Sequence, residues 1–384
     1  MDCFPIHVVH VVYRFAPGGL ENVVVQLVNH LPAPEFRHTV VALTEVDAGF
    51  AARITRADVE LIALGKAPGQ TLWLYPRVYR LFRRLRADVL HTCNLAAMEL
   101  TPVAAAAGIP RRVHAEHGWD LRERAGEAGR YRLLRRLCRP FVDEFVVVAE
   151  PLLAYMREKV GVPAGRLHLI ENGVDTARFR PRAAGDRPPA DFPFAGADTC
   201  VIGTVGRLET IKNPGLLLDA FRQLVESGRA GAERLRLVMV GDGTLAGEMR
   251  ERVRAAGLQD RVWLPGNRAD IADILRALDC FVLPSLSEAT SCVLQEAMAS
   301  GLEIVATAVG GTPDLLGDGR YGRLAPSGDA PALAAAIWSA CHADASERLG
   351  PLARQRIEER YALPAIMARY RALFAPGRAA KGGE

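Results

Sequence analysis

The sequence lacks the features that mark membrane-spanning, secreted and metal-binding proteins. No apolar run reaches the length of about 18 residues that a transmembrane helix needs. The N-terminus leads directly into the apolar segment 6–12, without the charged and long apolar regions of a signal peptide. The seven cysteines are scattered, odd in number, and have no spacing typical of zinc sites or disulfide frameworks. We therefore expect a cytoplasmic protein.

An excess of one charge is also missing. The 48 basic and 44 acidic side chains give a net charge of only +4, so nothing in the balance points to nucleic acid. Apolar residues make up 49% and charged residues 24%, as in soluble globular proteins. At 384 residues the chain exceeds one ordinary hydrophobic core, which favours two domains. The arginines are unevenly spread, with clusters at Arg80, Arg83, Arg84 and Arg86, and at Arg130, Arg132, Arg135, Arg136 and Arg139.

Short apolar segments alternate with helical patterns along the chain, and this alternation predicts parallel sheets covered by helices on both faces. A segment rich in proline, glycine and charge interrupts the alternation at about 176–198, after which it starts again. We expect strands at 6–12, 39–43, 60–64, 88–91, 112–116 and 144–148, and then at 200–205, 237–240, 262–264, 280–283 and 304–307.

The predicted fold class is therefore α/β, with two Rossmann-like domains facing an interdomain cleft. The expected boundaries are an N-terminal domain at 1–177, a linker at 178–198, a second domain at 199–362, and a terminal helix and tail at 363–384. Because ligands of such sheets bind outside the carboxyl ends of the strands, we looked there for candidate site residues.

Two glutamates eight residues apart, Glu288 and Glu296, flank the most informative segment of the chain. Thr290 or Ser291 is a suitable N-cap for a helix from Cys292 that ends before a glycine. The N-terminus of such a helix attracts phosphate. Glu296 then lies about 7 Å along the helix from the cap, roughly the reach from a diphosphate to a ribose, with Glu288 on the other side. The segment therefore suits a nucleotide diphospho-sugar.

Further candidates follow other predicted strands. Arg207 and Lys212 come after the strand at 200–205 and could neutralise a diphosphate. His117 follows the strand at 112–116 and could bond a sugar hydroxyl. Glycines allow close backbone approach at sharp turns after three strands. Taken singly, each feature also fits an ordinary turn or a solvated surface charge. The glycines are Gly18, Gly19, Gly206 and Gly241.

In combination and order, these motifs resemble the retaining glycosyltransferases of family 4, which have the GT-B fold. The resemblance covers about residues 6 to 330. It is carried by Gly18-Gly19-Leu20-Glu21, Glu116-His117-Gly118, Asn172-Gly173-Val174-Asp175, Gly206-Arg207-Leu208 with Lys212, Gly241-Asp242-Gly243, and Glu288 to Glu296 followed by Ala-Met-Ala-Ser-Gly301.

The resemblance implies roles for these residues. Arg207 and Lys212 should bind the donor diphosphate, Glu296 the ribose and Glu288 the transferred sugar. His117 should line the sugar pocket. The backbone at Gly18, Gly19, Gly206, Gly241, Ala289, Thr290 and Ser291 should border the donor. The terminal helix should cross back to the first domain. Such enzymes are usually independent of metals and need no cofactor, which agrees with the missing Asp-x-Asp motif.

The segments 14–22 and 283–292 look closest to sugar transferases associated with exosortase-linked exopolysaccharide loci. Two residues depart from the family pattern. Ala289 replaces a glycine and would cost about 1 kcal/mol if the position needs a positive φ. Glu303 replaces a proline at the start of a predicted strand, away from the site, where we expect an effect on stability at most.

The expected function is transfer of a hexosyl unit from a UDP- or GDP-sugar to a saccharide or lipid-linked acceptor, with retention at the anomeric carbon. The alternatives are a sugar-nucleotide 2-epimerase of the same fold, a non-catalytic sugar-nucleotide binding protein and a two-lobed sugar-binding protein. The missing signal peptide counts against the last of these.

The arginine-rich helices mix basic and apolar positions, so they fit either peripheral contact with the anionic inner face of the cytoplasmic membrane or ordinary half-solvated packing.

Overall fold

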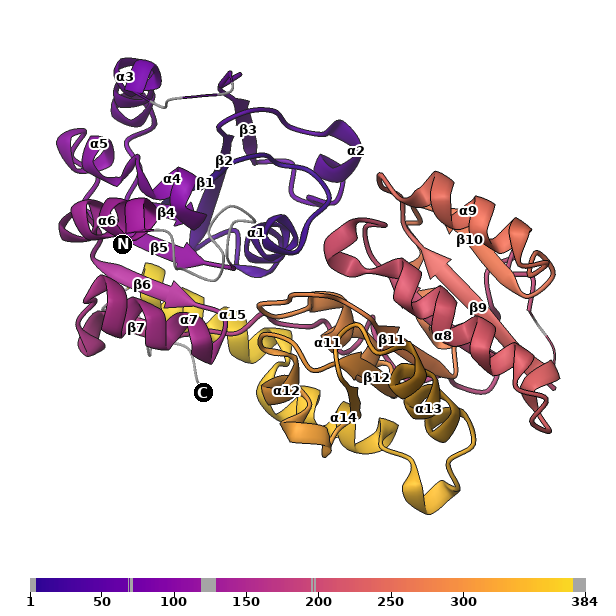
Figure 1. Cartoon of the computed structure of the whole chain (residues 1–384). Coiled ribbons are helices and arrows are strands. Elements are labelled where there is room, and N and C mark those ends of the chain that lie inside the picture. Colours follow the sequence, from indigo (N-terminus) through magenta and orange to yellow (C-terminus); the bar gives the residue numbers. More distant parts are fainter. Residues whose placement is uncertain are drawn as a thin grey trace, which may run out of the picture. The chain divides into compact units, whose positions relative to one another are not determined.

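The structure is a computed structural model that describes residues 5–67, 69, 72–118, 129–194, 196 and 198–375. The chain divides into two compact units (Figure 1). The first unit comprises the residues up to Gly173 and those from Pro364 onward. The second unit comprises Val174 to Leu363. The segment that we expected as a separate linker, 178–198, therefore counts with the second unit. The C-terminal residues 376–384 of the expected tail lie outside the described residues.

The first unit is built on a seven-stranded sheet in the order β3-β2-β1-β4-β5-β6-β7, with every pairing parallel. The order reverses direction between β1 and β4, as in doubly wound folds. Its strands are β1 (Ile6–Val12), β2 (Phe36–Ala42), β3 (Glu60–Ala63), β4 (Val89–Cys93), β5 (Arg111–Glu116), β6 (Glu144–Val147) and β7 (Leu167–Leu169).

Helices cover both faces of this sheet (Figure 1). Alternate residues of β1 point to opposite faces: Val9 and Val11 pack with α3 and α5, whereas Val12 packs with α1. The helices of this unit are α1 (Gly19–His30), α2 (Ala48–Ala51), α3 (Tyr75–Leu85), α4 (Asn94–Met98), α5 (Thr101–Ala106), α6 (Gly129–Cys138), α7 (Glu150–Tyr155) and, from the far end of the chain, α15 (Leu363–Phe374).

The return of α15 to the first unit confirms the expected crossing of the terminal helix. The backbone carbonyl of Leu373 accepts a hydrogen bond of 2.5 Å from Arg111 at the start of β5. Arg371 forms an ion pair of 2.8 Å with Glu35, just before β2. Two contacts at separate points fix the helix along the sheet, so the last described helix is an integral part of the N-terminal fold.

The second unit contains a six-stranded parallel sheet in the order β10-β9-β8-β11-β12-β13. Here the direction reverses between β8 and β11. Its strands are β8 (Cys200–Val205), β9 (Leu235–Val240), β10 (Val262–Gly266), β11 (Cys280–Leu283), β12 (Glu303–Thr307) and β13 (Arg323–Ala325). The predicted α/β class with two parallel-sheet domains is thus confirmed.

Two apolar cores fill the space above and below this second sheet. One core joins it to α10, α11 and α14, and the other joins it to α8, α9 and α13. The helices are α8 (Pro214–Glu226), α9 (Ala246–Ala255), α10 (Ile271–Ala277), α11 (Cys292–Ala299), α12 (Thr312–Leu315), α13 (Ala330–Cys341) and α14 (Gly350–Arg360). Across the described residues of both units, no helix is long and apolar enough to cross a membrane.

Candidate functional site

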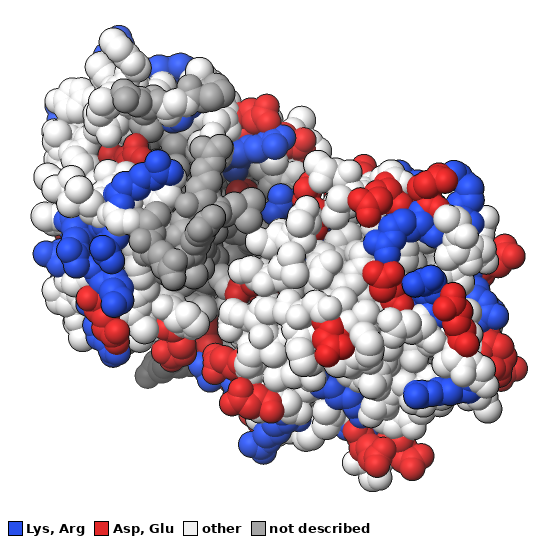
Figure 2. Space-filling view, in the orientation of Figure 1, with Lys and Arg blue, Asp and Glu red and all other residues white. Residues whose placement is uncertain are grey.

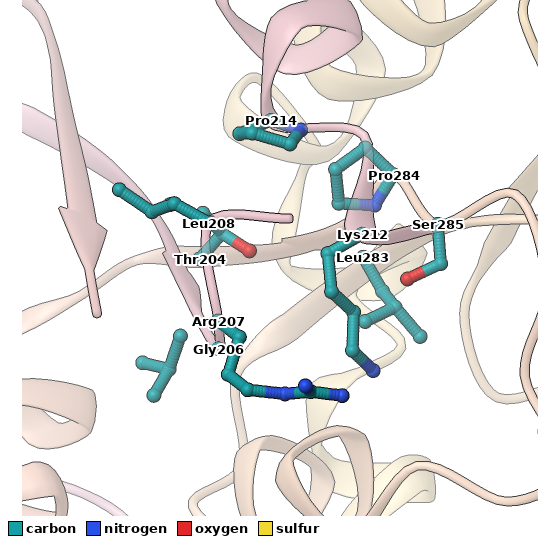
Figure 3. A pocket seen from close by; sticks show the side chains of 10 residues that line it. Thr204, Gly206, Arg207, Leu208, Lys212, Pro214, Leu283, Pro284 and Ser285 are labelled. Atoms are coloured by element: carbon teal, nitrogen blue, oxygen red, sulfur yellow. The ribbon is translucent and has the colours of Figure 1, made fainter. Parts of the chain in front are cut away.

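The clearest candidate site in the second unit lies at the reversal point between β8 and β11. In open α/β sheets this point opens a crevice beyond the carboxyl ends of the strands, because the chain leaves the two neighbouring strands in opposite directions. A pocket occupies this position (Figure 3). It is lined by Thr204, Val205, Gly206, Arg207, Leu208, Lys212, Pro214, Leu283, Pro284 and Ser285.

Two predicted phosphate-binding cations line this pocket together. Arg207 follows β8 directly, and Lys212 ends a short 3-10 turn before α8. Figure 3 shows their charged ends extending to the same side of the pocket. Arg207 is exposed and makes no side-chain hydrogen bond or ion pair with any described residue. The sequence placed both cations at one strand end, and the structure brings them together there.

Lys212 is held by a glutamate that the sequence analysis assigned to the sugar. The Lys212 Nζ lies 2.5 Å from Oε1 of Glu288, whose side chain is only 8% exposed. The buried hydroxyl of Ser285 donates a second hydrogen bond of 2.6 Å to the same oxygen. Sequence analysis missed Ser285, although its place just after β11 follows the same rule that identified Arg207. The carboxylate is therefore fixed in one orientation by two donors.

The backbone of Glu288 is fixed as well, by the turn that follows β12. The Gly311 N–H donates to the Glu288 carbonyl at 3.2 Å. Gly310 has a φ of +54°, and a Cβ placed on it would lie 1.6 Å from that carbonyl oxygen. Only glycine fits here, for both backbone and steric reasons. Thr307, at the end of β12, donates to the Ser285 carbonyl at 2.6 Å and joins the two loops.

Gly241 serves the loop that carries Arg207. It has a φ of +133°, and a Cβ there would lie 1.9 Å from the Gly206 carbonyl oxygen. The Gly206 N–H donates to the backbone carbonyl of Val240 at the end of β9, and the Leu208 N–H donates to the backbone carbonyl of Asp242, each at 2.9 Å. Close backbone packing between the two strand ends therefore sets the path of residues 206–208. The structure gives Gly241 a supporting position beside Gly206.

The predicted helix with its N-cap is present as α11. Ser291 is the N-cap, and its hydroxyl accepts a hydrogen bond of 3.4 Å from the Leu294 N–H. Gly301, with a φ of +71°, follows the helix in the left-handed conformation. Thr290 precedes the cap, and Glu296 lies half-buried on α11. The helix N-terminus thus follows directly on the loop of Glu288.

Ala289 does not strain that loop. Among the described residues, the non-glycine positions with positive φ are Arg86, Asn94, Asn213 and Asp318, and Ala289 is not one of them. The cost that we considered for an alanine in a left-handed conformation therefore does not arise.

In the first unit, the predicted glycine turn follows β1 and begins a helix. Gly18 is the N-cap of α1 and Gly19 its first residue. A Cβ on Gly18 would lie 2.1 Å from the Glu21 carboxylate, so the glycine leaves room for that side chain at the helix start. These residues follow β1, which borders the reversal point of the first sheet between β1 and β4.

His117 follows β5 in this unit. Both ring nitrogens are buried, and neither has a hydrogen-bond partner in the part of the chain that the structure describes. Burial lowers the pKa of His117 to about 4, so the imidazole is neutral at physiological pH. Its backbone N–H donates to Oδ1 of Asn94 at 2.8 Å. Asn94, which the sequence analysis missed, has a φ of +60°.

A buried ion pair lies directly before His117. Arg135 of α6, 1% exposed, donates to the two oxygens of the Glu116 carboxylate at 2.6 and 3.3 Å. His114 contacts the same carboxylate at 3.3 Å and Thr92 at 2.9 Å. Burial acts to raise the pKa of Glu116, but Arg135 and His114 hold it at about 2. One arginine of the second cluster is therefore structural.

Three buried histidines on adjacent strands form a second polar cluster that the sequence did not reveal. His10 on β1 contacts His91 on β4 at 2.9 Å and His38 on β2 at 3.0 Å. The ring of Phe374, on α15, packs against His10 and His91. Within the described parts of the chain, no group of three or more His, Cys, Asp or Glu side chains is placed to hold a metal ion.

Comparison with known proteins agrees with this architecture. Residues 17–178 match the family model described as Glycosyltransferase Family 4, and residues 199–342 match the model described as Glycosyl transferases group 1. The crystal structure of Anabaena Alr3699/HepE in complex with UDP superposes with a TM-score of 0.78, at 20% identity, over 95% of this chain and 98% of that one. A glycosyltransferase from Rickettsia africae ESF-5 superposes with a TM-score of 0.79, at 16% identity, over 96% and 98%.

Curated relatives match over part of their length. The putative glycosyltransferase EpsF of Bacillus subtilis strain 168 is 34% identical over 52% of this chain and 51% of its own. A UDP-Gal:alpha-D-GlcNAc-diphosphoundecaprenol alpha-1,3-galactosyltransferase of Escherichia coli is 27% identical over 61% of each chain. The chain thus spans about half to three fifths of the length of these relatives.

The two parallel-sheet units, each with a reversal point in its strand order, assign this chain to the GT-B class of glycosyltransferase folds. Residues 17–178 and 199–342 are thus each similar to a glycosyltransferase family model, and the remaining residues lie outside both matches.

Proposed function

We propose that this protein is a retaining glycosyltransferase that moves a hexosyl unit from a UDP- or GDP-sugar to a saccharide or lipid-linked acceptor. The convergence of Arg207 and Lys212 at the reversal point between β8 and β11 is the observation that carries the proposal. A diphosphate is a dianion or more at neutral pH, and two cations suit that charge, one of them paired with Glu288 in the loop that leads into α11. Structural neighbours solved with UDP and with UDP-glucose agree with this assignment.

In the proposed reaction, the bond between the anomeric carbon and the diphosphate oxygen breaks while the acceptor oxygen bonds to the same face of that carbon. The acceptor's proton passes to the departing diphosphate oxygen. Arg207, Lys212 and the α11 N-terminus stabilise the negative charge that develops on the leaving group. No metal or cofactor is needed in this scheme, because the side-chain cations of Arg207 and Lys212 carry that role.

The remaining site residues receive roles that match their surroundings. Glu288, oriented by Lys212 and Ser285, is assigned to hydroxyls of the transferred sugar. Glu296 of α11 is assigned to the ribose, and neutral His117 to a sugar hydroxyl. Gly18, Gly19, Gly206, Gly241, Ala289, Thr290 and Ser291 are assigned to the backbone that borders the donor. The proposed setting is cell-surface or exopolysaccharide synthesis of the exosortase-linked type, on the strength of segments 14–22 and 283–292.

A membrane-facing surface would give such an enzyme access to a lipid-linked acceptor. Helix α6 presents two exposed leucines, Leu133 at 56% and Leu137 at 62%, beside the basic side chains of Arg132 and Arg136. Basic side chains gather near α6 on the surface of the first unit (Figure 2). Exposed apolar and basic groups on one helix suit an anionic lipid surface. We propose peripheral contact of this helix with the inner face of the cytoplasmic membrane.

The proposed function is tested by screening UDP- and GDP-hexoses for thermal stabilisation and then assaying the stabilising donors. Arg207→Ala and Lys212→Ala should each lower turnover at least about 100-fold. Near wild-type turnover of every active donor in both variants would refute the assignment. Proton NMR of the product reports retention. The 2-epimerase alternative, which the comparisons do not favour, predicts release of free UDP or an epimer without any acceptor.

A further inference from the structure

We infer that Asn94 is a positioning residue that holds His117 at the sugar-binding edge of the first unit. Asn94 follows β4 at the reversal point of the sheet, where ligands of such folds bind. His117 follows the neighbouring strand, β5, and β4 and β5 pair in parallel. The inference deepens the proposed function and rests on it for the assignment of His117 to the sugar.

The conformation of Asn94 is the first observation. With a φ of +60° it occupies the left-handed region, which non-glycine residues adopt at some cost in free energy. Asparagine tolerates this region better than most residues. The backbone turns here directly out of β4 and into α4, so the residue that follows the strand must accept this conformation.

The side chain of Asn94 supplies the second observation. Its Oδ1 accepts the backbone N–H of His117 at 2.8 Å, a bond that links the ends of two adjacent strands. Few residues can meet both demands at once. Glycine tolerates the left-handed backbone but offers no acceptor, whereas aspartate meets both.

The third observation is the state of the His117 ring. Its two nitrogens are buried without a partner among the described residues, which leaves one donor and one acceptor available to a ligand. On the preceding residue, the Glu116 carboxylate is locked by Arg135. The backbone of His117 is therefore held through Glu116 and Asn94, while its ring nitrogens have no hydrogen-bond partner among the described residues.

These requirements give a matched set of variants. Asn94→Gly keeps or relaxes the backbone conformation and removes only the acceptor. Asn94→Asp retains the acceptor and serves as the conservative rescue. Asp318→Gly is the control, because Asp318 has a φ of +51° in an exposed turn of the second unit, outside the proposed site. All three should keep a wild-type melting temperature within a few degrees.

The deciding experiment measures kcat/KM for UDP- and GDP-hexoses in the full-length protein. Asn94→Gly should lower kcat/KM about tenfold, Asn94→Asp about threefold at most, and Asp318→Gly not at all. In a His117→Ala background, Asn94→Gly should cost less than about twofold, because the two residues act as one unit. An equal loss in both backgrounds, or no loss in either, would overturn the inference.

A readout without turnover separates this inference from the proposed function. The imidazole NMR signals of His117, assigned by their loss in His117→Ala, should shift or broaden in Asn94→Gly and stay unchanged in Asp318→Gly. If no nucleotide sugar is turned over but these signals respond, the proposed function fails and the coupling of Asn94 to His117 stands. Unchanged signals in Asn94→Gly would refute that coupling.

Discussion

The amino group of Lys212 and the carboxylate of Glu288 form an ion pair of 2.5 Å, in which a proposed phosphate ligand and a proposed sugar ligand neutralise each other. Arg207 beside them makes no such pair with a described residue. The two cations of the pocket are therefore not equivalent before a donor binds. Lys212 must be shared between Glu288 and an incoming diphosphate.

This sharing predicts opposite effects on nucleotide affinity. Glu288→Gln removes the competing charge, so UDP or GDP should bind as tightly as in the wild type or tighter, while turnover falls at least about 100-fold. Lys212→Ala should weaken the same nucleotide. Isothermal titration calorimetry and initial rates measure both quantities. Glu251→Gln, which removes an exposed ion pair with Arg254 on α9, is the control. Weaker nucleotide binding in Glu288→Gln would contradict the shared-cation interpretation.

The contact of Gly310 with Glu288 predicts a strong local effect of one methyl group. Gly310→Ala combines a left-handed backbone with a Cβ 1.6 Å from the Glu288 carbonyl, so we expect a loss of about 2–4 kcal/mol in unfolding free energy and almost no turnover. Gly228→Ala is a matched control, because its φ is +65° but nothing lies within 4 Å. Urea unfolding should show only about 1 kcal/mol there, with full activity. Equal effects in the two variants would rule out the steric contact as the cause.

Glu303 is a structural brace of the second unit, in agreement with its expected distance from the site. Its carboxylate accepts the Gly350 N–H at 2.9 Å, near the start of α14, and pairs with Arg323 at 2.6 Å. Glu303→Ala should therefore destabilise the protein by about 2–3 kcal/mol, since two hydrogen bonds to a mostly buried charge are lost. Calorimetry should show a melting temperature lower by about 4–10 °C. The KM for the donor should not change; a raised KM would place Glu303 in the site after all.

The buried histidines predict acid sensitivity confined to the first unit. Burial lowers the pKa values of His38 and His91 to about 3, and that of His10 well below its usual value. Below about pH 6.5 the unfolded chain takes up protons that the folded chain refuses. Stability is therefore fully present above pH 6.5 and is lost as the pH falls below that value, by about 1.4 kcal/mol per pH unit for each of His38 and His91 until about pH 3.

Hydrogen exchange at pH 5 and 7 tests this prediction within one molecule. His342 is the single histidine in the sequence of the second unit, and it is exposed on the structure. Amides of β1, β2 and β4 should lose protection on acidification before those of β8, β9 and β11. Simultaneous loss in both sheets would exclude the histidine cluster as the cause.

The proposed membrane contact predicts sensitivity to charge on α6. Leu133→Glu with Leu137→Glu should abolish co-sedimentation with vesicles of phosphatidylglycerol and phosphatidylethanolamine, and leave activity on a soluble acceptor intact. Leu352→Glu on α14 is an exposed leucine elsewhere and should not matter. Binding should weaken with salt. Failure of the wild type to bind even at low salt would remove the proposal.

Local signals explain which features could be predicted from the sequence. The cap and terminating glycine of α11 lie within a few residues of the helix, so the pattern identifies both ends. The edge strands β7 (Leu167–Leu169) and β13 (Arg323–Ala325) were missed, because three residues are too few to display a period. The buried histidines of β1 were interpreted as part of an ordinary buried strand, since their partners lie on other strands.

Contacts between distant loops account for what the sequence could not show. Ser285 meets Glu288 across a short turn, but Gly310 reaches the same glutamate from the end of another strand. Asn94 and His117 are 23 residues apart and become neighbours only because β4 pairs with β5. Strand order in space, which a single sequence does not encode locally, creates these contacts.

The bonding of Val174 has a consequence for how such proteins recombine. Its N–H donates to the backbone carbonyl of Tyr361, and its carbonyl accepts from the backbone N–H of Leu363, each at 2.9 Å. The first and last residues of the second unit are therefore hydrogen-bonded to each other. The second unit is thus an insertion in the first, with adjoining ends. Exchange of this unit between relatives requires two crossovers, at Gly173 and at Pro364. After a single crossover at Gly173, α15 would come from one relative, and the histidines that it packs against would come from the other.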